Sequence, residues 1–160
     1  MSKTLSIILK LFEVARILAK VVFIVCIVGG VGCLIASVIY PIMGEMLEIL
    51  VAEQGFDSPY VISACLITAI MFAGEAVSAF FAEKYFAQVL DAGTPFTLDG
   101  AKKCFRFGLV TAIASAAITV SSGMVISIAL LFSPDAYSLN EDASGLLVTG
   151  ILFIFMSVIF

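Results

Sequence analysis

The side chain with the most distinctive chemistry in this chain is the carboxyl group of Glu75. It is the only Asp, Glu, Lys or Arg inside four long apolar segments, and ionisable groups at membrane depth are often functional. Thr68 and Ser78 share its helical face, so we expect the carboxyl group to point toward other helices. Three interpretations stay open: a hydrogen bond from a Ser or Thr of the third segment, an ion pair with Lys20 or Arg106, or a carboxyl group used in transport. The first two are favoured because no further acid or base accompanies Glu75 in the apolar segments.

Other reaction centres are missing from the sequence. There is no His, and no GxSxG, HExxH or phosphate-binding glycine loop. The four cysteines, Cys26, Cys33, Cys65 and Cys104, form no CxxC pair, so neither a zinc site nor a paired-thiol redox centre is indicated. We therefore predict a non-enzymatic protein without catalytic residues, metal or cofactor. The thiols are expected to pack as small apolar groups, with a redox or acylation role for Cys104 as the alternative.

The segments that position these residues predict a membrane protein. The chain is 62% hydrophobic and only 12% charged, whereas charged residues make up about 25% of a soluble domain. Four segments are long enough to cross a hydrocarbon core of about 30 Å as helices, namely 21–40, 60–81, 107–132 and 143–160. The first is longer than the apolar part of a signal peptide, so we expect it to be retained. The fold prediction is all-α: residues 1–160 form one polytopic membrane domain, an antiparallel bundle of four transmembrane helices with cytoplasmic helical extensions.

The distribution of charge predicts the orientation of this bundle. All eight basic residues precede the first apolar segment or lie between the second and third, namely Lys3, Lys10, Arg16, Lys20, Lys84, Lys102, Lys103 and Arg106. The other two connections carry only acidic charge, namely Glu45, Glu48, Glu53, Asp57, Asp135, Glu141 and Asp142. Basic connections stay on the cytoplasmic side, so both termini are expected in the cytoplasm of a bacterial inner membrane. There Lys102, Lys103 and Arg106 can meet lipid phosphates, or Glu83 and Asp91.

Helical patterns continue beyond the expected membrane boundaries. Residues 3–20 carry a polar, basic stripe and predict an amphipathic helix that lies on the membrane or runs directly into the first span. The second helical pattern runs from Pro59 to Ala92, about 50 Å, and ends at Gly93. Its last turns should project into the cytoplasm and be covered by the apolar side of the N-terminal helix. On the outer side, a short interfacial helix is expected at approximately 42–54.

Small residues mark faces where helices can approach closely. Gly29, Cys33 and Ala36 form such a face in the first span, and the third span carries two, which are Ser115–Thr119–Gly123–Ser127 and Gly108–Ala112–Ala116. We expect them to pack inside one chain, with a homo-oligomer contact or a polar path through the membrane as alternatives. The last apolar segment reaches Phe160 without a charged flank, so we expect the natural chain to continue.

The connection at residues 93–108 combines several helix-boundary signals. Thr97 can cap the third helix, and Asp99 suits the positive end of its dipole. Pro95 fixes the turn, and Phe96 is expected to fill the space between the helix ends.

This connection, with its Gly-x-Pro-Phe turn, resembles the bacterial membrane-protein family called domain of unknown function 2975. The motif positions are Pro95, Phe96, Thr97, Asp99, Arg106 and Gly108. Gly100 departs from the family pattern, and the charged tail typical of the family is missing. The resemblance implies four transmembrane helices, cytoplasmic ends and genes that neighbour small helix-turn-helix regulators.

The functional hypothesis is an accessory, sensor or regulatory subunit that acts through a membrane complex or a soluble regulator. Direct nucleic-acid binding is not expected, because few basic charges lie on the inner side and they are dispersed. Membrane lipids and a protein partner are the expected contacts, and a homo-oligomer is an alternative assembly. The alternative function is a small transporter or pore subunit that uses Glu75.

Overall fold

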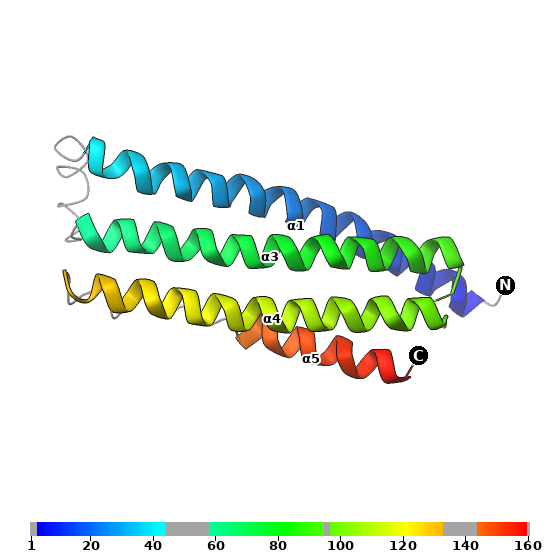
Figure 1. Cartoon of the computed structure of the whole chain (residues 1–160). Helices are drawn as coiled ribbons and strands as arrows, with labels where there is room; N and C mark the ends of the chain where they lie inside the picture. Colours follow the sequence, from blue (N-terminus) through cyan, green and yellow to red (C-terminus); the bar gives the residue numbers. More distant parts are fainter. Residues whose placement is uncertain (1–2, 44–57, 95–96, 133–143, 160) are drawn as a thin grey trace.

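The computed structural model describes residues 3–43, 58–94, 97–132 and 144–159, and the regular secondary structure in these ranges is helical throughout. The four helices are α1 (Lys3–Ile42), α3 (Ser58–Ala92), α4 (Leu98–Ala129) and α5 (Ser144–Ile159) (Figure 1). The all-α prediction is confirmed, and α1, α3 and α4 are each long and apolar enough to cross a membrane. Helix α5 is apolar but has 16 residues, about 24 Å, so it is shorter than the predicted span. The expected outer helix and the acidic connections lie almost wholly outside the described residues.

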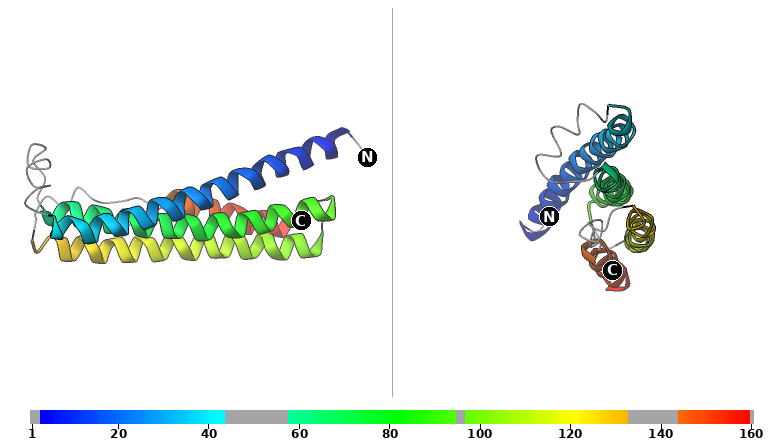
Figure 2. Two further views of the ribbon diagram at one scale, coloured as in Figure 1. Left: turned by 90° about the horizontal axis from the view of Figure 1, so that it is seen from above. Right: turned by 90° about the vertical axis from the view of Figure 1, so that its left-hand side faces the viewer.

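Helices that follow one another in the chain pack side by side. Helix α1 packs on α3, α3 on α4, and α4 on α5, and each pair runs antiparallel (Figures 1 and 2). Seen end-on, the helices form a curved row with α1 and α5 at its two ends (Figure 2, right). We call the end with both termini of the chain and the α3–α4 connection the basic end, and the opposite end the proline end. This arrangement leaves α1 and α5 held mainly by one neighbour each.

Helix α1 is a single unbroken helix. It runs from Lys3 to Ile42 with Pro41 in its last turn, so the amphipathic segment continues directly into the apolar one. Gly29 lies where α1 approaches α3: a Cβ atom there would stand 2.8 Å from the ring of Phe72. Part of the predicted small-residue face therefore packs within the chain. The Ala36 end of that face is exposed.

Helix α3 has the boundaries that its sequence predicts. It begins at Ser58, carries Pro59 in its first turn and ends at Ala92. Gly93 follows with a φ of 66°, a left-handed conformation that glycine adopts without strain, and its N–H donates to the Leu90 carbonyl at 3.2 Å. Helix α3, which follows the longest helical pattern of the sequence, therefore ends at a local stop signal, the left-handed Gly93.

An aromatic cluster at the basic end joins all four helices. We use this name for Phe12 of α1, Tyr85 and Phe86 of α3, Phe107 of α4 and Phe153 of α5. The Phe12 ring lies 6.3 Å from Tyr85 and 5.7 Å from Phe86, and Phe107 lies 4.4 Å from Phe153, measured between ring centroids. Phe12 thus covers the last turns of α3, as predicted. Helix α5 covers them as well, which the sequence did not predict.

The contact between α4 and α5 is a close approach of two backbones. A Cβ atom at Gly108 would lie 2.7 Å from the carbonyl oxygen of Gly150, and one at Gly150 would lie 2.7 Å from the N atom of Ala112. Only residues without a Cβ atom allow this separation. The predicted Gly108–Ala112 face is therefore the face on which α5 packs.

Candidate functional site

Glu75 lies on the side of α3 that faces α1. Its Oε2 atom accepts a hydrogen bond from the Cys26 thiol at 3.5 Å. The Cys26 side chain is buried and Glu75 is half-buried. The expected ion pairs of Glu75 were wrong, because Lys20 pairs with Glu83 instead, and Arg106 is exposed on α4.

The reason for this correction is the register between α1 and α3. The two helices are antiparallel (Figure 1). The hydrogen bond from Cys26 to Glu75 places these two residues at the same level. Lys20 lies six residues nearer the basic end, about 9 Å along the helix, where it meets Glu83. The sequence places all these residues on helices, but it does not contain the register.

Glu75 also lines an open groove to which all four helices contribute. The groove has a volume of about 480 Å³, within the range of small-molecule sites. Its lining comprises Ala15, Leu18, Ala19 and Val22 of α1, Glu75, Ser78, Ala79, Ala82 and Phe86 of α3, Phe107 and Thr111 of α4, and Leu146 and Thr149 of α5. We call it the Glu75 groove. Its walls are apolar except for one carboxyl group and three hydroxyl groups.

The three hydroxyl groups of the Glu75 groove differ in their hydrogen bonding. Ser78 donates to the Gly74 carbonyl at 3.0 Å, and Thr149 donates to the Gly145 carbonyl at 2.8 Å. Thr111 is 1% exposed, and its Oγ1 atom has no hydrogen-bond partner among the described residues. A buried hydroxyl group without a partner costs about 1–3 kcal/mol. Thr111 is therefore the one hydroxyl group of the groove lining without a described hydrogen-bond partner, and its Oγ1 atom is itself buried.

The Glu75 groove borders directly on the aromatic cluster. Phe86 and Phe107 belong to both. The sequence analysis did not single out either ring, nor Thr111, as functional. An apolar helix contains many Phe and Thr residues, and only the packing of α4 and α5 brings these three to Glu75.

Cys104 lies inside the aromatic cluster. Its side chain is fully buried, and its thiol donates to the Phe153 carbonyl at 3.3 Å. A side-chain hydrogen bond also joins it to Tyr85. All four cysteines are free thiols. The burial of Cys104 favours the predicted packing role over acylation.

Six of the eight basic residues divide into two groups. Arg16 and Lys20 of α1 pair with Glu83 of α3 at 3.1 and 3.7 Å, and Lys84 lies 4.3 Å above the Phe80 ring. The expected pairing of Glu83 with the basic residues of α4 was therefore wrong, because Glu83 faces α1. Lys102, Lys103 and Arg106 are exposed on α4, where they are open to lipid phosphates.

The residues of the 93–108 connection form structural contacts at the basic end. Thr97 caps α4 by accepting from the Gly100 N–H at 3.0 Å, and Asp99 lies in the first turn, as predicted. Gly108 packs on α5. Pro95 and Phe96 lie outside the described residues. The connection and Glu75 are thus separate features of the protein.

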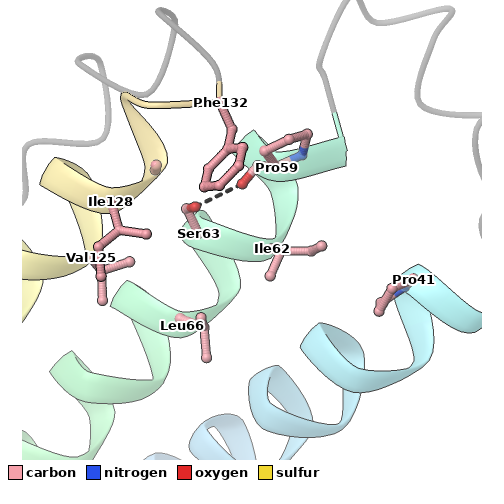
Figure 3. A pocket seen from close by; sticks show the side chains of 9 residues that line it. Pro41, Pro59, Ile62, Ser63, Leu66, Val125, Ile128 and Phe132 are labelled. Carbon is pink, nitrogen blue, oxygen red and sulfur yellow. Dashed lines mark hydrogen bonds between the residues drawn. The ribbon is translucent and has the colours of Figure 1, made fainter.

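A larger cavity lies between the helices at the proline end (Figure 3). Its volume is about 550 Å³, and eight of its nine lining residues are apolar. The remaining one, Ser63, donates its hydroxyl hydrogen to the Pro59 carbonyl at 2.7 Å (Figure 3). Phe132 points into the same space (Figure 3). With no charge and no unpaired hydroxyl to orient a ligand, this cavity is a weaker candidate than the Glu75 groove.

The composition and the three long apolar helices indicate the class, a helical membrane protein, and the Glu75 carboxyl group of its second long helix lines an open groove. A scan against models of protein families and searches of curated proteins and of solved structures found no match. The resemblance to domain of unknown function 2975 therefore stays a prediction. Within the described ranges, no group of three or more His, Cys, Asp or Glu side chains could hold a metal ion.

Proposed function

We propose that this chain is a non-enzymatic protein of a bacterial inner membrane that acts as a sensor or accessory subunit through a protein partner. In this proposal the Glu75 groove receives the signal, and the basic end, on the cytoplasmic side, presents the response. The observation that supports it is the sharing of Phe86 and Phe107 between the groove and the aromatic cluster.

The aromatic cluster offers a physical route from the groove to the ends of the row. Phe107 packs against Phe153 of α5, and Phe86 packs against Phe12 of α1. A molecule in the groove that displaces either ring must move the helix on the other side of it, because close-packed aromatic side chains have no spare volume. Helices α1 and α5 are the ones most free to shift, since each packs mainly on a single neighbour.

The basic end also carries the features that a partner could recognise. Leu98, Lys102, Arg106 and Ser157 line a shallow groove of about 530 Å³ between α4 and α5. A soluble regulator or the cytoplasmic part of a membrane complex would bind there. The chain itself is not proposed to contact nucleic acid.

The test is whether partner binding depends on the aromatic cluster. The complex would be purified in mild detergent from native membranes, and its mass and composition measured. Phe153→Ala should reduce the partner-bound fraction at least tenfold while helix content by circular dichroism is retained. Gly123→Ala, on an open face of α4, should leave that fraction unchanged. A chain that purifies alone in all three forms would overturn the proposal.

The second candidate is a small oligomeric transporter or pore subunit. It is favoured by the placement of Glu75 in an open groove. The hydroxyl groups of α4 favour a packing role over a polar path through the membrane, because Thr119 and Ser122 donate to carbonyls of their own helix at 3.0 and 2.8 Å. Glu75→Gln tests transport: unchanged proton or solute flux in vesicles, with normal assembly, would remove this candidate.

A further inference from the structure

We infer that the Glu75 groove binds amphiphilic cations, molecules that carry an ammonium or phosphonium charge on a hydrocarbon body. The inference deepens the proposed sensor function, on which it rests for its biological role, by naming the class of signal.

The charge of the groove calls for a cationic ligand. Glu75 is the only acidic or basic residue in its lining. Arg16 and Lys20, two cations of α1, are paired with Glu83. Glu75 itself accepts from a thiol, a weak donor, and a carboxylate has room for several more hydrogen bonds. A charge in an apolar setting is stabilised most effectively by an opposite charge.

A metal ion fits this groove less well than an organic cation. Metal ions of the kinds that carboxylates bind need about six oxygen ligands. The groove supplies one carboxyl group and one unpaired hydroxyl group. An ammonium or phosphonium group carries the same sign of charge without requiring a closed ligand shell.

The apolar walls match the hydrocarbon part of such a ligand. Leu18, Val22 and Leu146 provide aliphatic surface, and burial of apolar area contributes about 25 cal/mol per Å². Phe86 and Phe107 add aromatic surface for the hydrocarbon body at the far end of the groove, because Phe86 lies eleven residues, about 16 Å, from Glu75 along α3. A volume of about 480 Å³ suits a molecule of this kind.

Thr111 lies in the groove lining away from Glu75, and its Oγ1 atom is buried without a described partner. Gly74 packs on Ile118, which is seven residues, about 10 Å, from Thr111 along α4. A cation held at Glu75 therefore does not depend on the Thr111 hydroxyl group.

The experiment measures binding of tetraphenylphosphonium and decylammonium to the purified full chain in lipid nanodiscs by equilibrium dialysis. Both should bind saturably, and Glu75→Gln should weaken both at least tenfold. Thr111→Val should leave the affinity for both within twofold. Glu13→Gln, the same change at an exposed position of α1, should alter neither. Equal affinity of wild type and Glu75→Gln, or uptake that does not saturate, would overturn the inference.

A measurement on the wild-type chain covers the case in which a variant does not fold. Dicyclohexylcarbodiimide, an apolar reagent for carboxyl groups, should label Glu75, and tetraphenylphosphonium should reduce that labelling at least fivefold. Labelling of Glu75 that is unaffected by saturating tetraphenylphosphonium would contradict the inference. Cation binding without any effect on partner binding would leave the site standing and refute the sensor function. Partner binding that depends on Phe153, in a chain that binds no cation, would refute the cation site and leave the proposed function standing.

Discussion

Adding one methyl group at Gly108 should separate α4 from α5. The Cβ atom of Gly108→Ala would lie 2.7 Å from the Gly150 carbonyl oxygen and 2.7 Å from the Ile154 N atom, where ordinary contact begins at 3.4 Å. Both neighbours are backbone atoms, so relief requires α5 to move away by about 0.7 Å. Overpacking of this kind costs about 1–3 kcal/mol. The movement would also loosen the contact between Phe107 and Phe153.

The control is the same substitution on an open face of the same helix. A methyl group added at Gly123 would meet no described atom within 4 Å outside its own helix, so Gly123→Ala should gain up to about 1 kcal/mol from helix propensity. The assay is equilibrium unfolding in mixed micelles titrated with sodium dodecyl sulfate and followed by circular dichroism. Gly108→Ala should unfold at a lower detergent fraction than wild type, and Gly123→Ala at an equal or higher one. Equal midpoints for the two variants would refute the close approach of α4 and α5.

Three further substitutions test other contacts in the same unfolding assay. Thr97→Ala removes the hydrogen bond to the Gly100 N–H and should cost about 1 kcal/mol, with faster hydrogen exchange confined to the first turn of α4; uniform exchange along α4 would contradict the cap. Arg16→Gln breaks a partly exposed pair with Glu83 and should cost less than about 1 kcal/mol, so a loss of several kcal/mol would show that this pair is a core interaction. Gly93→Ala forces a methyl group onto a left-handed residue and should cost about 1–2 kcal/mol; an unchanged midpoint would place the turn in another conformation.

The helix boundaries could be predicted because their signals are local. Pro59 and Gly93 mark the ends of α3, and Thr97 with Asp99 marks the start of α4. Each signal acts on backbone groups within a few residues, so no tertiary information is needed. The same is true of the apolar length of α1, which carries no breaker before Pro41.

The surroundings of Glu75 could not be predicted because they depend on how helices slide past one another. A shift of α1 by six residues exchanges Cys26 for Lys20 as the residue opposite Glu75. The sequence of each helix allows either register. The packing of Phe12 on Tyr85 and Phe86 and the closeness of Gly29 to Phe72 select the observed one.

The hydrogen bonding of Thr111 could not be predicted from the sequence for the same reason. Thr119 donates to its own helix carbonyl, whereas Thr111 on the same helix has no partner among the described residues. Both residues have the same type and similar neighbours in sequence. Only the position of α3 and α5 around α4 places Thr111 at the groove.

Occupancy of the Glu75 groove is expected to change the positions of α1 and α5 at the basic end. The most direct test is the distance between spin labels at Ile7 of α1 and Val158 of α5, both exposed, introduced as non-natural amino acids so that the native thiols stay in place. Saturating tetraphenylphosphonium should shift the distance distribution in wild type and leave it unchanged in Glu75→Gln. An identical distribution in wild type with and without the cation, under conditions where binding is measured, would contradict the account.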